Sequence, residues 1–479
     1  MPLFEVESRS INGGRVTGLP PYQLGIAESP DTENTDPTDV KGATTRPGSS
    51  LYQSMASAGS GARGVGLYPW VRNNGTSYYF AAFATTIFSL DGTTSLSVKT
   101  GMATDSLMMA VPLNNMLAVF ASGLRPQISS AGSTLASITA GTFLPTQARI
   151  GAPYASRVWC AGDTANPNTI YSCAVNNPED WSTVNNAASI VVGDGDGDKI
   201  KGLSGSQSAL YILKRNNLYA LLGTSPFDYL VKKVRQVGVV SDYGYASDGE
   251  GCFFASDDGI YYAVGMNIAR LSDPIFQDYK DVSDKSTMAL EVKGDKLFCF
   301  YKASGSENNA AFVLAYMRKM PTGEVKGVWG KYTSQPYQVA KTSSLNALYG
   351  LTNASTLQLY QLDTGSSGAV TGTWNTPDMD YGDPMAVKKL ARYYIHISPP
   401  LATTTLTVRW FANGASIGSD VDITIGTTSS YAMPQRGPQS AGTITGNYLR
   451  MRLTWSGQMT VYGFKTYAEM EVSGDLPRR

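Results

Sequence analysis

Apolar and polar residues alternate along short runs through most of the chain, and Gly, Asn or Asp separates one run from the next. Runs of about four to eight residues with this period, separated by turn residues, are typical of antiparallel β-hairpins. The clearest predicted hairpins lie at 77–92, 208–223 and 251–265, and 294–303 is expected to pair with 309–319. Helical spacing of apolar residues is rare, and only 276–292 is expected to contain one short turn of helix.

Several of these hairpins share one plan, in which a strand, a turn and a second strand end in an aromatic pair. Examples lie at 77–90, 208–222, 251–264 and 345–362. They are spaced by ~40–50 residues or multiples of it, the range of four-stranded propeller blades. No WD, kelch or complete Asp-box signature recurs, and SDDGIYY (256–262) lacks the end of such a box. We predict a β-propeller, with a long sandwich or a pair of barrels as the alternative.

We place the turns within these hairpins by their polar residues. The expected turns are 91–92, 215–217 and 257–259, because Asp-Gly, Asn-Asn and Asp-Asp-Gly are frequent turn sequences.

The two ends of the chain differ from the middle. Residues 1–50 contain a polar, Pro-containing stretch without a core pattern, which predicts an extended N-terminal arm. Residues 371–479 contain five or more alternating strands joined by Gly, Pro and Ser loops, which predict a β-sandwich. The expected fold is therefore all-β: an arm over 1–50, a β-propeller over 51–370 and a C-terminal β-sandwich over 371–479.

The composition narrows the function classes. The chain has 479 residues with 38 Lys+Arg against 38 Asp+Glu, so its formal net charge is zero. This balance argues against a protein that holds nucleic acid by neutralising phosphates. No apolar run approaches ~18 residues and no signal peptide is predicted. The four cysteines (Cys160, Cys173, Cys252, Cys299) form no C-x-x-C pair, which favours buried free thiols in a reducing compartment and leaves one bridge open.

One run of acidic residues has the spacing of a calcium loop. Asp194, Asp196 and Asp198 occupy alternate positions, like the first ligands of an EF-hand. Lys199 stands where that loop needs Gly, and Gly205 stands where it needs Glu. We favour a Gly-Asp turn before a strand and leave cation binding open. The prediction is no metal site and no cofactor.

Catalytic constellations are not expected either. The single histidine, His396, should share a half-exposed strand face with Tyr394, with Ile395 and Ile397 on the other face. The chain has no G-x-S-x-G motif, and GSGARGVG (59–66) lacks the Lys-Ser/Thr of a P-loop.

Two carboxylate pairs and one basic cluster complete the candidates. Asp257/Asp258 and Asp378/Asp380 are neighbours along the chain, whereas a glycosidase needs carboxylates facing each other across a sugar. The densest basic cluster, KKVRQVG (232–238), is expected to be a solvated strand rather than a phosphate contact. We predict no catalytic residues.

An ordered series of motifs resembles a known protein family. The chain has N-x-I-Y-x-S/C at 168–173 and P-E-D-W at 178–181, then G-D-G-D and I-K-G-L, and afterwards the hairpins of 209–223 and 237–275. This succession resembles the β-propeller of tail nozzle, head-to-tail connecting or tail-stabilisation proteins of short-tailed bacteriophages. TTRPGSSLYQ (44–53) resembles the Arg-Pro-Gly segment before that propeller, and 373–397 resembles the start of the C-terminal β-domain.

The resemblance implies a structural protein of the virion tail, a nozzle or hub that is assembled in the bacterial host cytoplasm and is not an enzyme. Such proteins form a homo-oligomeric ring, commonly a hexamer, below the portal and adaptor. The ring retains the genome, lets double-stranded DNA pass at ejection without specific binding, and docks tail fibres, spikes or a needle, with no direct membrane insertion. The balanced charge agrees with a conduit that does not grip DNA.

Two alternatives remain open. A carbohydrate-binding or receptor-binding propeller of a tail is suggested by aromatic residues over turns and by Asp257 and Asp258. An intracellular scaffolding propeller is the other. For the phage role, the arm over 1–50 is expected to lie on a neighbouring subunit or on the adaptor, so that deletion of 1–40 leaves a folded propeller that fails to join tails.

Overall fold

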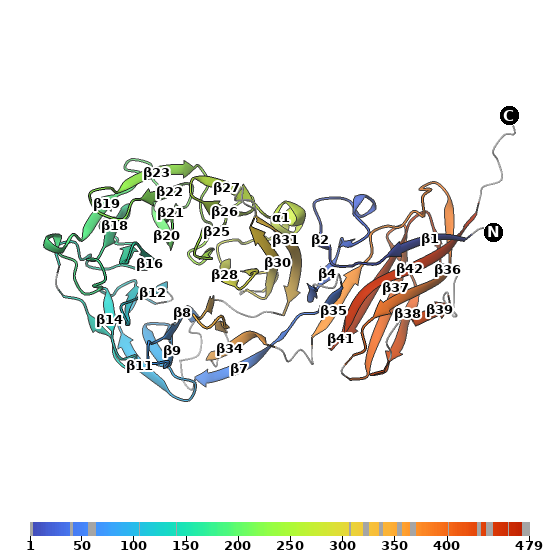
Figure 1. Ribbon diagram of the computed structural model, residues 1–479, viewed down its shortest axis with the longest axis horizontal. Helices are drawn as coiled ribbons and strands as arrows, with labels where there is room; N and C mark the ends of the chain where they lie inside the picture. Colours follow the sequence, from blue (N-terminus) through green and yellow to red (C-terminus); the bar gives the residue numbers. More distant parts are fainter. Residues whose placement is uncertain are drawn as a thin grey trace.

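Strands dominate the computed structural model (Figure 1). It describes residues 3–38, 42–55, 64–104, 106–139, 141–305, 308–319, 325–334, 339–351, 357–364, 370–400, 402–428, 433–436, 444–457 and 459–471. The α-helix of this part, α1 (Phe276–Asp281), confirms the short helical turn expected after residue 276. No helix in the same ranges is long and apolar enough to cross a bilayer.

Four-stranded antiparallel sheets, seven within the described ranges, are arranged around a common axis and are called blades 1 to 7. Blade 1 consists of β8(Gly64–Val71), β9(Ser77–Phe83), β10(Thr86–Leu90) and β11(Ser95–Thr100). Blade 2 consists of β12(Met108–Leu113), β13(Met116–Ala121), β14(Gln127–Ser129) and β15(Ala136–Ser137). Blade 3 consists of β16(Ile150–Tyr154), β17(Arg157–Ala161), β18(Thr169–Ser172) and β19(Ala188–Val191). Blade 4 consists of β20(Ile200–Gly205), β21(Leu210–Lys214), β22(Leu218–Leu222) and β23(Leu230–Arg235). Blade 5 consists of β24(Tyr245–Ser247), β25(Cys252–Ala255), β26(Ile260–Val264) and β27(Asn267–Arg270). Blade 6 is β28(Ala289–Lys293), β29(Lys296–Tyr301), β30(Ala310–Lys319) and β31(Val325–Thr333), and blade 7 is β32(Val339–Thr342), β33(Leu348–Leu351), β34(Leu357–Thr364) and β7(Gly48–Met55).

Blade 7 closes the ring with a strand from far earlier in the chain. Its outermost strand, β7, pairs antiparallel with β34, although more than 300 residues separate Leu51 from its partner Tyr360. The innermost strands contact one another in order, and the last of them, β32, contacts β8 of blade 1. The sheet series is therefore a closed seven-bladed β-propeller, and the expected all-β propeller fold is confirmed.

Alternation within one strand supplies two different cores. In β9, Tyr79, Ala81 and Phe83 pack toward blade 7, whereas Phe80 and Ala82 pack toward blade 2. An apolar cluster of this kind lies between every pair of consecutive blades. Because a blade is covered on both faces, its strands carry few charges. The same packing accounts for the low charged fraction, 16%.

The turns follow the predictions with one exception. Residues 215–217 join β21 to β22, and 257–259 lie between β25 and β26, as expected. The hairpin over 77–92 turns at 84–85 instead of 91–92, and Ala84 adopts a left-handed conformation there (φ 46°). The Asp91–Gly92 turn instead joins β10 to β11, and the Asp91 carboxylate accepts the backbone N–H groups of Thr93 and Thr94. Asp91 and Gly92 therefore form a turn, as predicted, but this turn joins β10 to β11 and not the two strands of the predicted hairpin.

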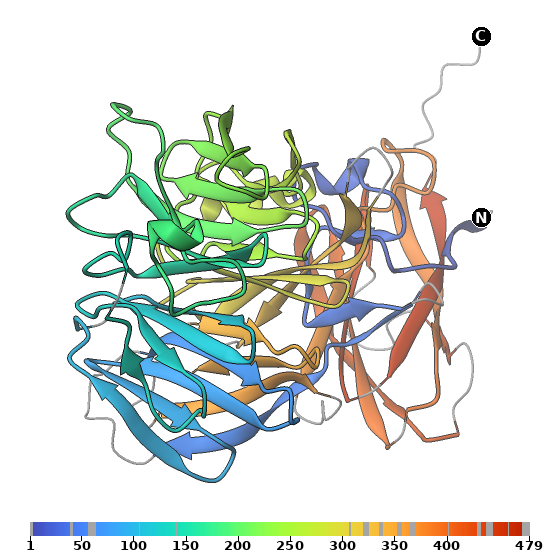
Figure 2. The same cartoon turned by 60° about the vertical axis from the view of Figure 1, so that its left-hand side comes forward.

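The C-terminal strands form a two-sheet sandwich beside blades 6 and 7 (Figures 1 and 2). One sheet has the order β38(Ala415–Ile425), β37(Thr404–Ala412), β41(Leu449–Ser456), β35(Thr371–Asn375) and β4(Thr32–Glu33). The other has the order β39(Met433–Arg436), β36(Val387–Ile397), β42(Thr460–Glu471), β6(Ala43–Thr45) and β5(Thr35–Pro37), with β40(Thr445–Gly446) beside β36 and β1(Leu3–Ser8) beside β42. Their facing apolar side chains, with Trp374 and Trp455 among the largest, form one core.

The first fifty residues differ from the extended arm that the polar pattern predicts. β1, β4, β5 and β6 are strands of the same chain's sandwich, and β2(Gly14–Arg15) pairs with β3(Glu28–Ser29) beside blade 6. These strands are mostly two or three residues long, so they are too short to show a period of two. Residues 39–41 lie outside the described ranges.

Candidate functional sites on the propeller axis and at the domain junction

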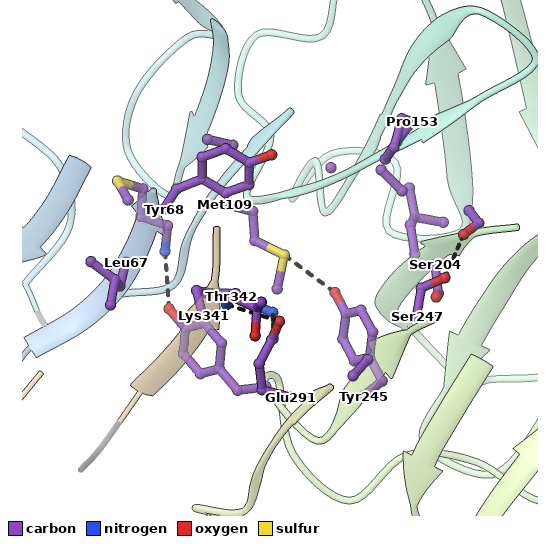
Figure 3. A pocket seen from close by; sticks show the side chains of 18 of the residues that line it. Leu67, Tyr68, Met109, Pro153, Ser204, Tyr245, Ser247, Glu291, Lys341 and Thr342 are labelled. Carbon is purple, nitrogen blue, oxygen red and sulfur yellow. Dashed lines mark hydrogen bonds and ion pairs between the residues drawn. The ribbon is translucent and has the colours of Figure 1, made fainter. Parts of the chain in front are cut away.

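A cavity of about 370 Å³ lies on the propeller axis, and every one of the seven inner strands contributes to its lining (Figure 3). Tyr68, Met109, Tyr245, Glu291 and Lys341 are labelled there on five different blades. Its volume falls in the range of small-molecule sites, roughly 300–1,000 Å³. The axis is therefore a concave candidate site.

The cavity combines aromatic rings with an ion pair. Lys341 Nζ lies 2.8 Å from Glu291 Oε2, and Glu291 Oε1 accepts the backbone N–H of Thr342 at 3.1 Å. The Tyr245 hydroxyl lies 3.3 Å from the Met109 sulfur. Burial raises the pKa of Tyr68, with a further contribution from the Glu291 charge, so its hydroxyl stays protonated. The lining therefore offers hydroxyl and ammonium donors while its charges balance.

Glycines let the inner strands converge on this axis. A Cβ at Gly205 would lie 1.7 Å from the carbonyl oxygen of Pro153 on the neighbouring inner strand. A Cβ at Gly151 would lie 2.6 Å from the Phe120 ring. A side chain at either position would push adjacent blades apart.

The acidic run 194–198 meets a lysine where an EF-hand would hold a cation. Lys214 Nζ lies 2.8 Å from both carboxylate oxygens of Asp196, and its side chain is fully buried. The Tyr219 hydroxyl donates to the same carboxylate at 3.0 Å. Burial would raise the pKa of Asp196, but the Lys214 ammonium and these hydrogen bonds lower it below its usual value.

The neighbouring carboxylate is also engaged. Asp198 accepts the backbone N–H groups of Arg215 and Asn216 and the Asn217 side-chain amide. Asp194 is exposed. In the described ranges no group of three or more Cys, His, Asp and Glu side chains is arranged to hold a metal. The run is a Gly-Asp turn that leads into β20, as the favoured interpretation has it.

The two carboxylate pairs hold turns and strands together. Asp257 makes a two-point ion pair with Arg215 of the neighbouring blade, at 2.8 Å for each bond, and this pairing lowers its pKa. Asp258 accepts the Tyr261 hydroxyl at 2.7 Å. In the sandwich, Asp378 pairs with Arg450, and Asp380 accepts a backbone N–H in its turn. Asp257 and Asp258 lie in the propeller and Asp378 and Asp380 lie in the sandwich, so the two pairs form no common site.

His396 lies on the face that alternation predicts. Ile395 and Ile397 are buried in the sandwich core, while His396 is half-buried on the opposite face. It borders a second cavity of the sandwich with Arg9 and Tyr462. The basic residues of 232–238 begin on β23, the exposed outermost strand of blade 4. Residues 59–63 of the glycine-rich GSGARGVG lie outside the described ranges, and 64–66 begin β8.

Sequence reasoning missed the residues that join the two domains. Arg15 is buried and makes a two-point ion pair with Asp278 of α1, at 2.6 and 2.9 Å, and a further bond to Asp31. Arg46 stacks on the ring of Tyr332 in blade 6 at 5.2 Å. The Arg-Pro-Gly segment contains Arg46, so its local pattern marked the place without revealing the contact.

A buried ionic network completes this junction. Lys296 of blade 6 lies 2.6 Å from Asp36 of β5 and 3.5 Å from Asp363 of β34. The Tyr332 hydroxyl bonds to Asp36. Burial would lower the pKa of Lys296, but the two carboxylates raise it, whereas burial would raise the pKa of Asp363 and the nearby lysines, Lys296 and Lys293, lower it. Charges from three parts of the chain are thus neutralised together.

Comparison with known proteins adds the fold neighbourhood. No family model and no curated protein matches the chain. Among solved structures, it is similar to the WD40 domain of Neurospora crassa Pan2, with 10% identity, 67% of this chain and 96% of that chain covered, and a TM-score of 0.43. It is also similar to the AfRom2 CNH domain, with 10% identity, 66% of this chain and 99% of that chain covered, and a TM-score of 0.41. A third similar structure is catalytically inactive virginiamycin B lyase of Staphylococcus aureus, with 12% identity, 65% of this chain and 98% of that chain covered, and a TM-score of 0.41. The propeller assignment itself rests on the sheet order and the closed ring of inner strands.

Proposed function

We propose that this chain is a non-enzymatic structural component of a short-tailed phage tail, the nozzle or hub, which works as a ring below the portal and adaptor. The observation that carries the proposal is the way the first 55 residues interlock both domains. They supply four strands to the sandwich and one closing strand to blade 7. A ring that retains pressurised DNA needs subunits whose domains keep their relative orientation.

The interlock resists separation of the domains at several points. Arg15 and Asp36, both from the N-terminal segment, make buried ion pairs with α1 and blade 6. The Asn34 side chain accepts the backbone N–H of Thr333 at 2.9 Å. Pulling the sandwich from the propeller would expose these charges, and breaking a buried ion pair costs several kcal/mol. Together with the ordered motifs over 44–397, this rigidity supports a role in a mechanical assembly.

The proposal is tested by electron microscopy of the purified full chain and, separately, of phage particles released by the bacterial strain that encodes it. We expect a closed ring with a hole of duplex width, and antibody label at the tail of purified particles. A chain that stays monomeric at high concentration and does not label particles would contradict it. The antibody label on particles decides, because it does not depend on ring assembly by the purified chain without the portal and adaptor.

The axial cavity favours a second candidate, a receptor-binding tail propeller that takes a neutral saccharide. Tyr68 and Tyr245 provide ring faces and hydroxyls, and the Glu291–Lys341 pair provides an acceptor beside a donor for vicinal hydroxyls. The inner edges of the inner strands add backbone donors and acceptors. Asp257 and Asp258, which suggested sugar binding from the sequence, are already engaged by Arg215 and Tyr261.

Saturation-transfer NMR with glucose, maltose and the sugars of the host surface tests this second candidate. We expect transfer that is lost in Tyr68→Phe combined with Lys341→Met and retained in Asp257→Asn. Transfer that survives the axial double variant, or the lack of transfer from every sugar of the set, would refute an axial saccharide site.

A further inference from the structure

The rim of blade 4 has the features of a protein interface. β23 is outermost in its sheet and pairs only with β22 within the described ranges, so its other edge is open. Lys232, Lys233 and Arg235 are exposed on this strand, and none of them has an ion pair with a described carboxylate. Phe227, just before the strand, is 90% exposed, and Leu230 is 49% exposed. An aromatic side chain beside cations and an open edge is typical of a binding surface.

A complementary edge lies in the sandwich. β38 ends the five-stranded sheet and pairs only with β37 in the described part of the chain. Its eleven residues include Asp420 and Asp422, both exposed, and no Lys or Arg. Arg409 pairs with Asp420 at 3.2 Å, whereas Asp422 accepts the Thr407 hydroxyl and has no ion pair with a cation among the described residues. β38 and β23 lie in different domains and far apart in Figure 1, so one chain cannot join them.

Charge decides which of these edges can pair between copies. Joining β23 to β23 would place lysines opposite lysines, and joining β38 to β38 would place carboxylates opposite carboxylates. Joining β23 to β38 brings opposite charges together and is the only favourable combination of the two. Such a contact uses two different surfaces, so it is head-to-tail, and head-to-tail contacts build rings or filaments rather than two-fold dimers.

We propose that β23 of one chain adds to the open edge of β38 of a second copy of this chain. This proposal rests on the proposed ring-forming function and identifies the contact that builds the ring. The backbone of β38 extends blade 4 outward. Lys232 and Lys233 project from opposite faces of β23, so one of them lies against Asp420 and Asp422, which share a face of β38, and Phe227 packs on the neighbour's sandwich. The edges that resist self-pairing thereby select a partner of opposite charge.

A charge-swap series on the full chain tests the proposal. Mass photometry and sedimentation velocity would measure the oligomer of the wild type, of Lys232→Glu/Lys233→Glu, of Asp420→Lys/Asp422→Lys and of the fourfold swap. We expect each double variant to weaken association by about tenfold or more and the fourfold swap to restore it. Mixing the two double variants should also restore assembly, because each then offers the edge that the other needs.

Matched controls separate this contact from general charge effects. Lys199→Glu/Lys280→Glu changes two exposed lysines without a described ion pair, and should leave assembly unchanged. Phe227→Ser should weaken association without a change in its salt dependence. Circular dichroism and the melting temperature would show that each variant is folded.

The outcomes separate the inference from the proposed function. Wild-type rings that persist in both double variants would overturn the β23–β38 contact and leave the ring function standing. A wild type that forms no rings and is missing from particles would overturn the function. Loss of duplex-DNA binding in Lys232→Glu/Lys233→Glu with unchanged oligomers would assign the rim to a polyanion and refute the inference. Weakening by each reversal with rescue by the swap would establish it.

Discussion

At the residue scale, buried charges in this chain hold segments together that are distant in the sequence. Lys214 neutralises Asp196, Lys296 joins Asp36 to Asp363, and Arg15 joins Asp31 to Asp278. A buried charge without a partner is expensive, so each of these pairs fixes the position of a turn or strand. Of the three carboxylates that looked like candidate ligands in the sequence, Asp196 is used in this way.

Replacing Lys214 by Met tests that role. The change leaves the Asp196 carboxylate without its cation, and we expect the free energy of unfolding to fall by about 3 kcal/mol. Denaturant titration would measure it. Lys199→Met, on the exposed part of the same turn, should change it by less than about 0.5 kcal/mol. Adding Asp196→Asn to Lys214→Met should recover part of the loss, and the lack of any coupling between the two sites would contradict the assignment.

Gly205→Ala tests the close approach of the inner strands. The new Cβ would overlap the Pro153 carbonyl, so blades 3 and 4 must separate, and we expect a loss of about 1–3 kcal/mol in the free energy of unfolding. Gly25→Ala is the control, because its Cβ would meet only the Glu28 side chain at 3.5 Å. Equal melting temperatures for the two variants would show that the axis tolerates wider spacing.

At the scale of elements, one strand serves two interfaces in the propeller, and one N-terminal segment serves two domains. β21 directs Leu210 and Ile212 toward blade 3 and Tyr211 and Leu213 toward blade 5. The N-terminal strands extend the sandwich sheets, and β7 completes blade 7. The stability of the sandwich therefore depends on residues about 400 positions away from its other strands in sequence.

Deleting residues 1–42 tests whether the sandwich needs the N-terminal strands while the propeller keeps its closing strand β7. The deletion removes β1 to β5 and with them the core side chain of Ile11, while β7 remains. We expect fast amide hydrogen exchange in β36, β42 and β35 and slow exchange preserved in blades 1 to 5. Unchanged protection of the sandwich strands would restore the interpretation of this segment as a separable arm. Removal of 472–479 serves as the control truncation.

At the scale of the whole molecule, the propeller and the sandwich meet through an ionic network. β1 and β42, the first and last strands of the described chain, pair within the sandwich, while β7 closes the propeller, so the N-terminal segment ties the two domains together (Figure 1). The junction is the place where solution conditions should alter the arrangement of domains.

Acid should weaken this junction. Because the folded-state pKa of Asp363 is lowered, its ion pairs contribute fully above the unfolded-state pKa of about 3.9 and are lost as pH falls through the lower folded value. We expect the free energy of unfolding to decrease on going from pH 5 to lower pH, with a smaller slope in Lys293→Met/Lys296→Met. Denaturant titrations across that range measure the slope. A slope equal to that of wild type would contradict a role of Asp363 in acid stability.

Loss of the Arg15 contacts should loosen the two domains. We expect Arg15→Ala to lose about 3 kcal/mol, since Asp278 would keep a partly buried charge without its partner. Small-angle X-ray scattering should show a larger radius of gyration, whereas Arg9→Ala, which removes an exposed pair with Glu7, should not change it. Identical scattering profiles would indicate that the strand pairing alone sets the orientation.

By itself, the sequence determined the local features of this protein. The alternation along 77–92, 208–223 and 251–265 specified strands, and the faces of His396 and Ile395 followed from the same period. These properties are local, because successive side chains of an extended backbone point to opposite faces of the sheet.

Tertiary structure alone decided the number of blades, the closing role of β7, the union of β1 with β42 and the partnership of Lys214 with Asp196. The axial cavity belongs to the same group, because seven strands from separate blades create it. Each of these features joins residues whose separation carries no local period. Their positions are fixed by ring closure and by the need to pair buried charges and strand edges, which are properties of the whole fold.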